Sequence, residues 1–453
     1  HLAVPTGPAP TRSRPCGFYN AIMLAYLPAA LTISLGWFLY DPVTLFSSAI
    51  FSIWVLIASL SKKEIKWMFG REQFLLFALL ATYSLSSIFN SGSLWLTFQG
   101  NYQRNFGLLF WISIYLVFAI STSGKIEIET FIFRSLLSVL CISIVYGLIQ
   151  MAKLDPIPWS NPYNAVQITL GNPNFAGALL GMISVIPIGV AINGPNSIAR
   201  RFLGTLIFCI CLFVAYGTKS LQAFVVAVIS VLVFSIILSY QNNNLAHKLF
   251  RVSSALLATF VLIFTSALLF GPKGWLGNLR EIFFYQGSVI QRLDFWRTGL
   301  EIFKSHPIVG VGPDNFQRYA ALYRTKEQIE RDGIFSIPDK AHSVPIDALA
   351  NGGIFAGILW IVFVLLIFRR LARSARGQIS PKNRANLAIL GGIWSGYVVQ
   401  ALISPDQIVL AVIGFMSAGL IVRLDGINQK SQVEKASNAK IKIDPVIIRS
   451  ALS

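Results

Sequence analysis

The stretch GPKGWLGNLREIFFYQGSVIQRLDFWRTGLEIFKSHPIVGVGPDNF, residues 271–316, opens the only long polar segment between two hydrophobic spans. The stretch GIFSIPDKAHSVPIDALANGG, residues 333–353, closes that segment. Before it the chain is one apolar span after another, and three more apolar spans follow it. A membrane protein that carries out chemistry on polar substrates needs a wet compartment for it. We therefore expect the functional residues to gather in and around this segment.

The composition is that of a membrane protein. Of the 453 residues, 55% are hydrophobic and only 12% are charged, and the mean hydropathy is +0.64. A soluble domain is usually about 45–50% apolar and about 25% charged. The formal net charge of +18 could indicate nucleic-acid binding. However, the basic residues stand in short loops between spans, where control of membrane topology explains them better. The four cysteines form no disulfide or metal-binding pattern, and we expect neither a metal nor a cofactor.

The apolar segments predict an all-α integral membrane protein. A helix that crosses a bilayer needs about 20 mostly apolar residues. Twelve segments qualify: 20–40, 43–60, 72–90, 106–122, 131–151, 174–194, 202–217, 220–240, 252–271, 345–368, 386–404 and 407–423. The expected organisation is a basic N-terminal segment at 1–17, transmembrane helices 1–9 within 18–271, a large outer loop at 272–341, transmembrane helices 10–12 within 342–424, and a disordered cytoplasmic tail at 425–453.

The distribution of lysine and arginine predicts the orientation of the chain. If the N-terminus is cytoplasmic, the cytoplasmic loops carry Lys62, Lys63, Lys66, Arg71, Lys125, Arg200, Arg201, Lys248, Arg251, Arg369, Arg370, Arg373, Arg376, Lys382 and Arg384. The short loops on the other side carry only Arg104, Lys153 and Lys219. Positive residues stay inside, so we expect both termini in the cytoplasm and the 272–341 loop outside, in the periplasm or extracellular space.

Within the outer loop, residues 288–305 predict one amphipathic helix. The expected apolar stripe consists of Val289, Leu293, Trp296, Leu300 and Phe303, and the expected polar face of Asp294, Arg297, Glu301 and Lys304. Arg292 borders the stripe, which predicts that it points towards the bundle. Pro307 and the glycines after it end the helix. Residues 317–333 predict a surface helix, and in GNPNFAG Gly171 suits a tight turn while Asn172 or Asn174 suits a helix cap.

The charged residues of the outer face indicate where chemistry takes place. Ionisable residues are almost absent from mid-membrane depth, which counts against ion-coupled transport. On the outer face, the cations Arg104, Lys219 and Arg292 suit a lipid pyrophosphate whose tail lies in the bilayer. His342, where the loop re-enters the membrane, suits a general base. Simpler roles stay open: Arg104 reaching lipid headgroups, Lys219 an interface cation, Arg292 a local ion pair, and His342 and His306 structural histidines.

These stretches resemble the O-antigen ligase and O-antigen polymerase superfamily, the lipid-linked glycan transferases of the bacterial inner membrane. RLDFWRTGLEIFKSHPIVGVGPDNF is similar to the loop motif of that family, and AHSVPIDALANGGIFAG is similar to its Ala-His-Asn motif and following glycine-rich helix. GNPNFAG and NYQRNFG are also similar to family stretches. Two positions differ from the family pattern: TKSLQAF stands where a Ser-Arg-Gly run is common, and Ser343 stands in place of the asparagine.

The resemblance implies a metal-independent glycosyltransferase in the bacterial inner membrane that moves a glycan from undecaprenyl pyrophosphate to an acceptor hydroxyl, with inversion. His342 would be the base, Arg292 and Arg104 would bind the pyrophosphate, and Lys219 would replace the arginine of the Ser-Arg-Gly run. We expect an O-antigen ligase of lipopolysaccharide biosynthesis, with lipid A–core or another carrier as acceptor. A polymerase that joins lipid-linked repeat units is the alternative, and a small-solute transporter is a second one.

Overall fold

The computed structural model describes residues 70–90, 94–101, 105–122, 128, 130–157, 159, 164–192, 197–240, 247–248, 250–252, 254–255, 257 and 288–450. All regular elements of this part of the chain are helices, as the sequence predicts. They are α3 Arg71–Asn90, α4 Leu94–Gln99, α5 Leu108–Thr122, the π-helix η1 Thr130–Leu136, α6 Leu137–Met151, the 3-10 helix η2 Ile168–Leu170, α7 Pro173–Ile183, α8 Val185–Ile192, α9 Ile198–Gly217, α10 Leu221–Ser239, α13 Ser288–Ser305, α14 Phe316–Tyr323, α15 Lys326–Asp332, α16 Val344–Arg376, α17 Pro381–Ile403 and α18 Ile408–Ser450.

Most of the predicted spans are present as helices. Eight segments of the described chain are long and apolar enough to cross a membrane, and α5 is a shorter apolar helix of 15 residues. Together they correspond to nine of the twelve predicted spans. The predicted spans 20–40, 43–60 and most of 252–271 lie outside the described residues, so the total of twelve stays a prediction.

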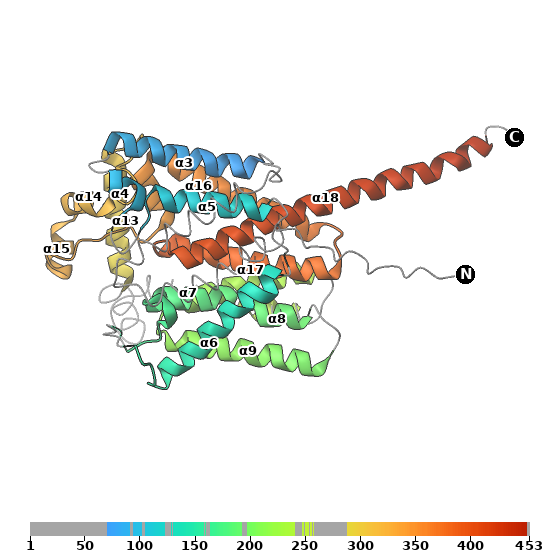
Figure 1. The fold of residues 1–453 in the computed structure, drawn as a ribbon, viewed down its shortest axis with the longest axis horizontal. Helices are drawn as coiled ribbons and strands as arrows, with labels where there is room; N and C mark the ends of the chain where they lie inside the picture. The colour runs from blue at the N-terminus through green and yellow to red at the C-terminus, as the bar shows by residue number, and fades with distance from the viewer. Residues whose placement is uncertain are drawn as a thin grey trace, which may run out of the picture.

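The helices pack into a bundle with α17 and α18 near its centre (Figure 1). Gly181 of α7 lets that helix approach α10 closely, because a Cβ there would lie 2.9 Å from both the carbonyl oxygen of Ala223 and the amide nitrogen of Ala227. Small residues serve this purpose in membrane helices, where close backbone contact replaces the hydrophobic driving force. The largest fully buried side chains include Trp394 and Tyr397 of α17, which form the middle of the apolar core.

One end of the bundle carries the polar elements. Figure 1 shows α13, α14 and α15 gathered at the end where α16 and α18 begin, and α18 runs from there past the opposite end of the bundle. Arg369, Arg370, Arg373 and Arg376 of α16 lie near that opposite end, followed by Lys382 and Arg384 at the start of α17. The two groups of residues that the sequence assigns to opposite sides of the membrane therefore lie at opposite ends of the bundle.

The loop after α13 fills a break in α16. Gly353 has φ of +71° and interrupts the helix, so its neighbours lose their regular hydrogen-bond partners. The segment Pro307–Gly312 supplies new ones: the amide of Ile354 donates to the carbonyl of Pro307 at 2.8 Å, and the amides of Val311 and Gly312 donate to the carbonyls of Ala350 and Asn351 at 2.9 and 2.8 Å. The outer loop is therefore joined to α16 through main-chain hydrogen bonds.

Side chains of α3 hold the same junction from the other side. The hydroxyl of Ser86 donates to the carbonyl of Asn351 at 2.9 Å, and the side-chain amide of Asn90 donates to the carbonyl of Gly310 at 3.0 Å. Three segments that are far apart in the sequence thus share one hydrogen-bonded junction.

Two local predictions are confirmed. Helix α13 spans residues 288–305 as the apolar pattern predicts. Gly171 has φ of +66°, and the side chain of Asn172 accepts a hydrogen bond from the amide of Asn174 at 2.9 Å, which makes Asn172 the N-cap of α7. The cap is followed by Pro173, whose fixed φ and missing amide hydrogen suit the first helical turn.

Two other predictions are wrong. The single helix predicted over 317–333 is two helices, α14 and α15, because Thr325 adopts an extended conformation and caps α15 by accepting from the amide of Gln328. The tail predicted to be disordered at 425–453 is helical as far as Ser450, as the second half of α18. Lysine, glutamate, glutamine and alanine are good helix formers, and a helix whose first half is buried extends without a new nucleation step.

The predicted topology is tested by cysteine labelling. Gln317 of α14 and Ser380 before α17 are both exposed, and they lie at opposite ends of the bundle. In a variant whose native cysteines are replaced by alanine, Gln317→Cys should react with a membrane-impermeant maleimide added to intact cells. Ser380→Cys should react only after the membrane is opened. Labelling of Ser380→Cys in intact cells would place α13, α14 and α15 in the cytoplasm.

The junction at Gly353 is tested by adding one methyl group. Both Gly353 and Gly333 have positive φ, at +71° and +89°, together with an extended ψ, so alanine at either position costs about 1–3 kcal/mol of backbone strain. A Cβ at Gly353 would also collide with the carbonyl of Ile308, whereas nothing lies within 4 Å at Gly333. We expect Gly353→Ala to lose about 1–3 kcal/mol more than Gly333→Ala. Equal melting temperatures of the two purified variants would contradict this.

Candidate functional site

His342 lies where the outer loop meets the first turn of α16. Its backbone has φ of +55°, a conformation that a residue with a Cβ rarely adopts. The neighbouring backbone is held by Asp347, whose carboxylate accepts from the amide of Ala341 at 2.8 Å and whose amide donates to the carbonyl of Ser343 at 2.8 Å. The turn is therefore fixed by hydrogen bonds on both sides of His342.

The contacts of the His342 ring define its tautomer. Its Nδ1 lies 3.3 Å from the carbonyl oxygen of Lys340. A carbonyl only accepts hydrogen bonds, so we assign the proton of the neutral ring to Nδ1 and the lone pair to Nε2. The ring also lies beside Phe295 of α13, with 4.9 Å between the ring centroids. The ring is half-buried and is oriented by contacts on two sides.

Helix α13 lies against this turn. The indole nitrogen of Trp296 donates to the carbonyl of His342 at 3.3 Å. Gly299, one turn further along, allows close contact, because a Cβ there would lie 3.1 Å from the Cβ of Ala341 and 2.7 Å from a methyl group of Ile346. The face of α13 that carries Phe295, Trp296 and Gly299 is thus the face that packs on the start of α16.

The predicted apolar stripe of α13 is displaced from the face that the structure buries. Thr298, Gly299 and Ile302 are the buried residues of this helix, whereas Leu293 and Leu300 are 42% and 40% exposed. Residues three and four apart share a helix face. Arg292 stands three and four positions before Phe295 and Trp296, so it lies on the packed face rather than at its border.

Arg292 therefore shares the face of α13 that contacts His342. Arg292 is half-buried, and this burial lowers the pKa of its guanidinium. An arginine begins from so high a pKa that it still carries its charge. Its fork of N–H donors matches the oxygens of a phosphate, and a partly buried cation binds such an anion more strongly than an exposed one.

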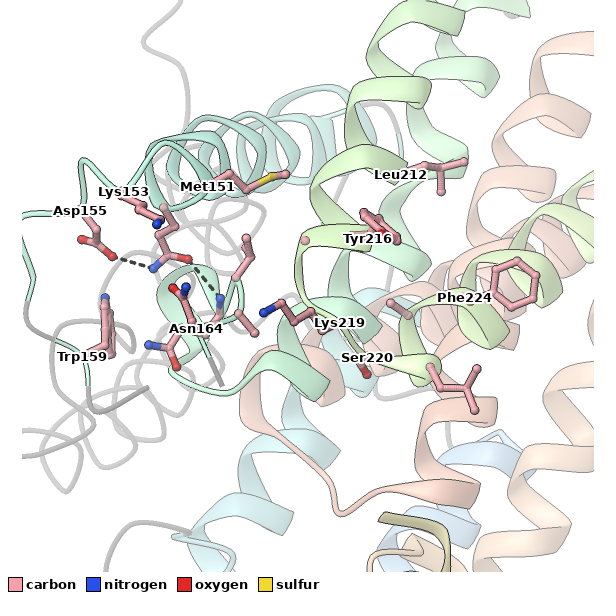
Figure 2. Close-up of a pocket in the computed structure, with 18 of the residues that line it drawn as sticks. Met151, Lys153, Asp155, Trp159, Asn164, Leu212, Tyr216, Lys219, Ser220 and Phe224 are labelled. Atoms are coloured by element: carbon pink, nitrogen blue, oxygen red, sulfur yellow. Dashed lines mark hydrogen bonds between the residues drawn. The ribbon is translucent and has the colours of Figure 1, made fainter. Parts of the chain in front are cut away.

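Lys219 lines a pocket to which Arg292 and His342 do not contribute. It forms the turn between α9 and α10, with φ of +55°, and its side chain is exposed. The pocket has a volume of about 1130 Å³, and its described lining residues include neither Arg292 nor His342. In Figure 2, Lys219 reaches from the turn towards Asn164, and Lys153 lies at the end of α6 across the pocket. The lining from α9 and α10 includes the apolar residues Leu212, Phe224 and Ala227.

Arg104 lies outside the described residues, but the segments on either side of it are fixed. The amide of Asn105 donates to the carbonyl of Asn101 at 3.0 Å, and the amide of Gly107 donates to the carbonyl of Gln99 at 3.2 Å. The described residues 99–101 and 105–107 are thus hydrogen-bonded to one another. The proposed contact of Arg104 with a phosphate stays a prediction.

A buried group of charged residues was not predicted from the sequence. Lys340 forms an ion pair with Asp314, and a cavity of about 30 Å³ lies among Lys340, Asp314, Asp347 and Asp406. The neighbouring carboxylates hold the pKa of Lys340 above its usual value although burial alone would lower it, and burial raises the pKa of Asp406 to about 7. Lys340 stands two residues before His342, which is the one sequence signal that could have drawn attention to it.

His306 makes packing contacts with neighbouring side chains. Its Nδ1 lies 3.2 Å from the hydroxyl oxygen of Ser305, and its ring meets the ring of Tyr319 edge-on at 5.1 Å. These contacts fasten the end of α13 to α14. They agree with the structural role that the sequence favours for His306.

The fold and the site define a multi-pass membrane protein with a polar, histidine-bearing region at one end of its helical bundle. Residues 204–361 match the family model described as O-antigen ligase, which confirms the resemblance to the O-antigen ligase and polymerase superfamily. The matched range contains Lys219, Arg292 and His342. A comparison with curated proteins gives no match. The family indicates a membrane enzyme that transfers glycans.

The role of Arg292 is tested against a second arginine of the same helix. Arg292→Lys keeps the charge but loses the fork, so we expect glycan transfer to fall about 10- to 100-fold, which corresponds to one charge-assisted bond of about 1.5–3 kcal/mol. Arg297→Lys changes an exposed residue and should leave transfer near the native rate. Transfer is measured as glycan joined to acceptor per molecule of protein in the membrane. Similar losses in the two variants would show that Arg292 has no special place on α13.

Proposed function

We propose that the protein is a glycosyltransferase of the inner membrane that moves a glycan from undecaprenyl pyrophosphate to an acceptor hydroxyl. The observation that carries this proposal is the contact of His342 with Phe295 and Trp296, on the face of α13 that also bears Arg292 and within the range matched by the family model. A base and a phosphate-binding cation at one place are the two groups that a direct displacement needs.

The chemistry follows from the two side chains. A sugar hydroxyl is a poor nucleophile until its proton begins to leave, and an imidazole with its lone pair on Nε2 can accept that proton near neutral pH. The acceptor oxygen then bonds to the anomeric carbon while the bond from that carbon to the pyrophosphate oxygen breaks. Arg292 stabilises the charge that develops on the departing pyrophosphate. One displacement of this kind inverts the anomeric configuration.

The large pocket beside Lys219 suits a lipid-linked donor. Its lining includes the cations Lys153 and Lys219 and, on α9 and α10, apolar side chains such as Leu212 and Phe224. An amphiphile with an anionic head and a hydrocarbon tail would meet a matching surface in both parts. In this proposal the lysines contact donor phosphates before or during transfer, and Arg104 is a second contact of the pyrophosphate. The enzyme would need no divalent metal, since cations of the chain bind the phosphates.

The proposed site faces away from the cytoplasm. The short loops at the end of the bundle with α13, α14, α15 and the start of α16 carry few cations, namely Arg104, Lys153 and Lys219. The positive-inside rule counts short loops, so it assigns this end to the periplasm or the cell exterior. We favour an O-antigen ligase, with lipid A–core or another carrier as the acceptor. A polymerase differs only in using a second lipid-linked repeat unit as acceptor. Loss of the gene would leave unattached polymer in the first case and capped single repeats in the second.

The proposed base is tested by two histidine variants. His342→Ala should reduce glycan transfer by about 10²–10⁴-fold, the usual cost of losing a positioned base, while the protein still inserts and still binds the lipid-linked donor. His306→Ala removes the ring that packs on Tyr319 and should keep most of the activity. Transfer is measured as glycan on the acceptor per molecule of protein in the membrane.

Two outcomes would contradict the role of His342. Transfer at the native rate by His342→Ala would place the base elsewhere. Loss of the variant from the membrane, together with normal transfer per remaining molecule, would mean that His342 only stabilises the turn before α16.

A further inference from the structure

An ion pair is buried beneath the outer loop, next to the proposed base. The ammonium group of Lys340 pairs with the carboxylate of Asp314, and the two side chains are only 7% and 2% exposed. The ring of Phe106 lies 5.2 Å from the same ammonium group and covers it. Withdrawing two charges from water costs several kcal/mol for each ion, and a well-packed apolar pair is often as stable. General stability therefore gives little reason for an ion pair at this place.

Asp314 holds the two chain segments 99–101 and 105–107. The amides of Asn101 and Phe106 both donate to one oxygen of its carboxylate, and the side-chain amide of Asn101 donates to its main-chain carbonyl. The second carboxylate oxygen faces Lys340. The backbone of Asp314 has φ of +62°, so the residue is held in this orientation against its usual preference. The two segments are thus attached to the outer loop through Asp314.

Lys340 connects this carboxylate to His342. Its side chain pairs with Asp314 while its carbonyl oxygen lies 3.3 Å from Nδ1 of His342. The next amide, that of Ala341, donates to Asp347 at 2.8 Å. A shift of the Lys340 side chain would move the carbonyl that orients the imidazole. The pair is therefore in a position to fix the direction of the ring.

We infer that the Lys340–Asp314 pair is a positioning element for His342, which joins the segments that carry Asn101 and Phe106, the loop after α13 and the re-entry into α16 in one arrangement. The inference rests on the proposed function, in which His342 is the base. Neither residue contacts the reacting atoms in this scheme. Both act by holding the carbonyl of Lys340 and the segments with Asn101 and Phe106 in place, and a displacement of about 1 Å in an active site can cost 100-fold in rate.

The experiment removes both charges at once. Lys340→Met or Asp314→Asn alone leaves an uncompensated buried charge, so either single variant should be poorly inserted. The double variant Lys340→Met with Asp314→Asn leaves neither partner of the pair as an unpaired charge, so it should accumulate in the membrane. Purified double variant is assayed with lipid-linked oligosaccharide extracted from a strain that lacks the gene, and with membrane glycolipid of that strain as acceptor. We expect kcat to fall about 100-fold and KM for the donor to change less than about threefold.

A matched pair at the other end of the bundle is the control. Arg370 donates to Glu72 at 2.7 Å, and the side chain of Glu72 is only 2% exposed. The double variant Arg370→Met with Glu72→Gln removes a buried ion pair far from His342. It should lower the amount of protein in the membrane more than the rate per molecule. This control separates a general effect of lost ion pairs from an effect on the site.

The outcomes distinguish the positioning role of the Lys340–Asp314 pair from the role of His342 as the base. A double variant at Lys340 and Asp314 that transfers glycan at a native kcat would overturn the positioning role, even if His342→Ala is inactive. A double variant that fails to accumulate would overturn it as well, because the pair would then be required for folding. An active His342→Ala variant would instead overturn the proposed base and leave the positioning element without a function.

Discussion

A helix inside a bilayer cannot leave its backbone amides and carbonyls unpaired, yet α16 breaks at Gly353. The segment Pro307–Gly312 supplies the missing hydrogen-bond partners, and these main-chain hydrogen bonds fix the position of the outer loop. Because α13 ends two residues before that segment, its face with Trp296 is brought onto the turn that carries His342. Irregular backbone next to a membrane span is tolerated where other protein covers it, and here that covering protein also carries the site.

Buried charges occur at both ends of the bundle and have different surroundings. At the end rich in arginine, Asp425 of α18 accepts from Arg370 and Arg373 of α16, so these residues join helices that also pack through apolar contacts. At the opposite end, Lys340 and Asp314 belong to two loops, and their ion pair joins these loops beside a small apolar cluster that includes Val311, Phe316 and Ala341. An ion pair that joins two loops fixes how these loops lie against each other more than it adds to the stability of the fold. For this reason we expect the Lys340–Asp314 pair and the Arg370–Glu72 pair to respond differently to removal of their charges.

The sequence predicted the parts of the fold that follow from local patterns. The period of α13, the proline after it and the asparagine cap at Asn172 are short-range features, and all three agree with the structure. The buried face of α13 was predicted wrongly because Thr298 and Gly299 carry no hydrophobic signal, although the small size of Gly299 lets the helix approach Ile346. The ion pair of Lys340 with Asp314 could not be predicted, since it joins residues far apart in the sequence without any periodic pattern. The places of His342 and Arg292 on the outer face made them candidates. The family resemblance then favoured a functional role over a structural one, which the charge pattern alone could not do.

The central claim is that the donor pyrophosphate lies on the face of α13 that bears Arg292, with its anomeric carbon in reach of an acceptor held by His342. An experimental structure of the protein in a lipid bilayer, with undecaprenyl pyrophosphate bound, tests this claim most directly. The claim predicts phosphate oxygens within about 3 Å of the Arg292 guanidinium, on the side of α13 that faces His342. Pyrophosphate bound away from α13, with Arg292 in contact only with protein, would contradict it.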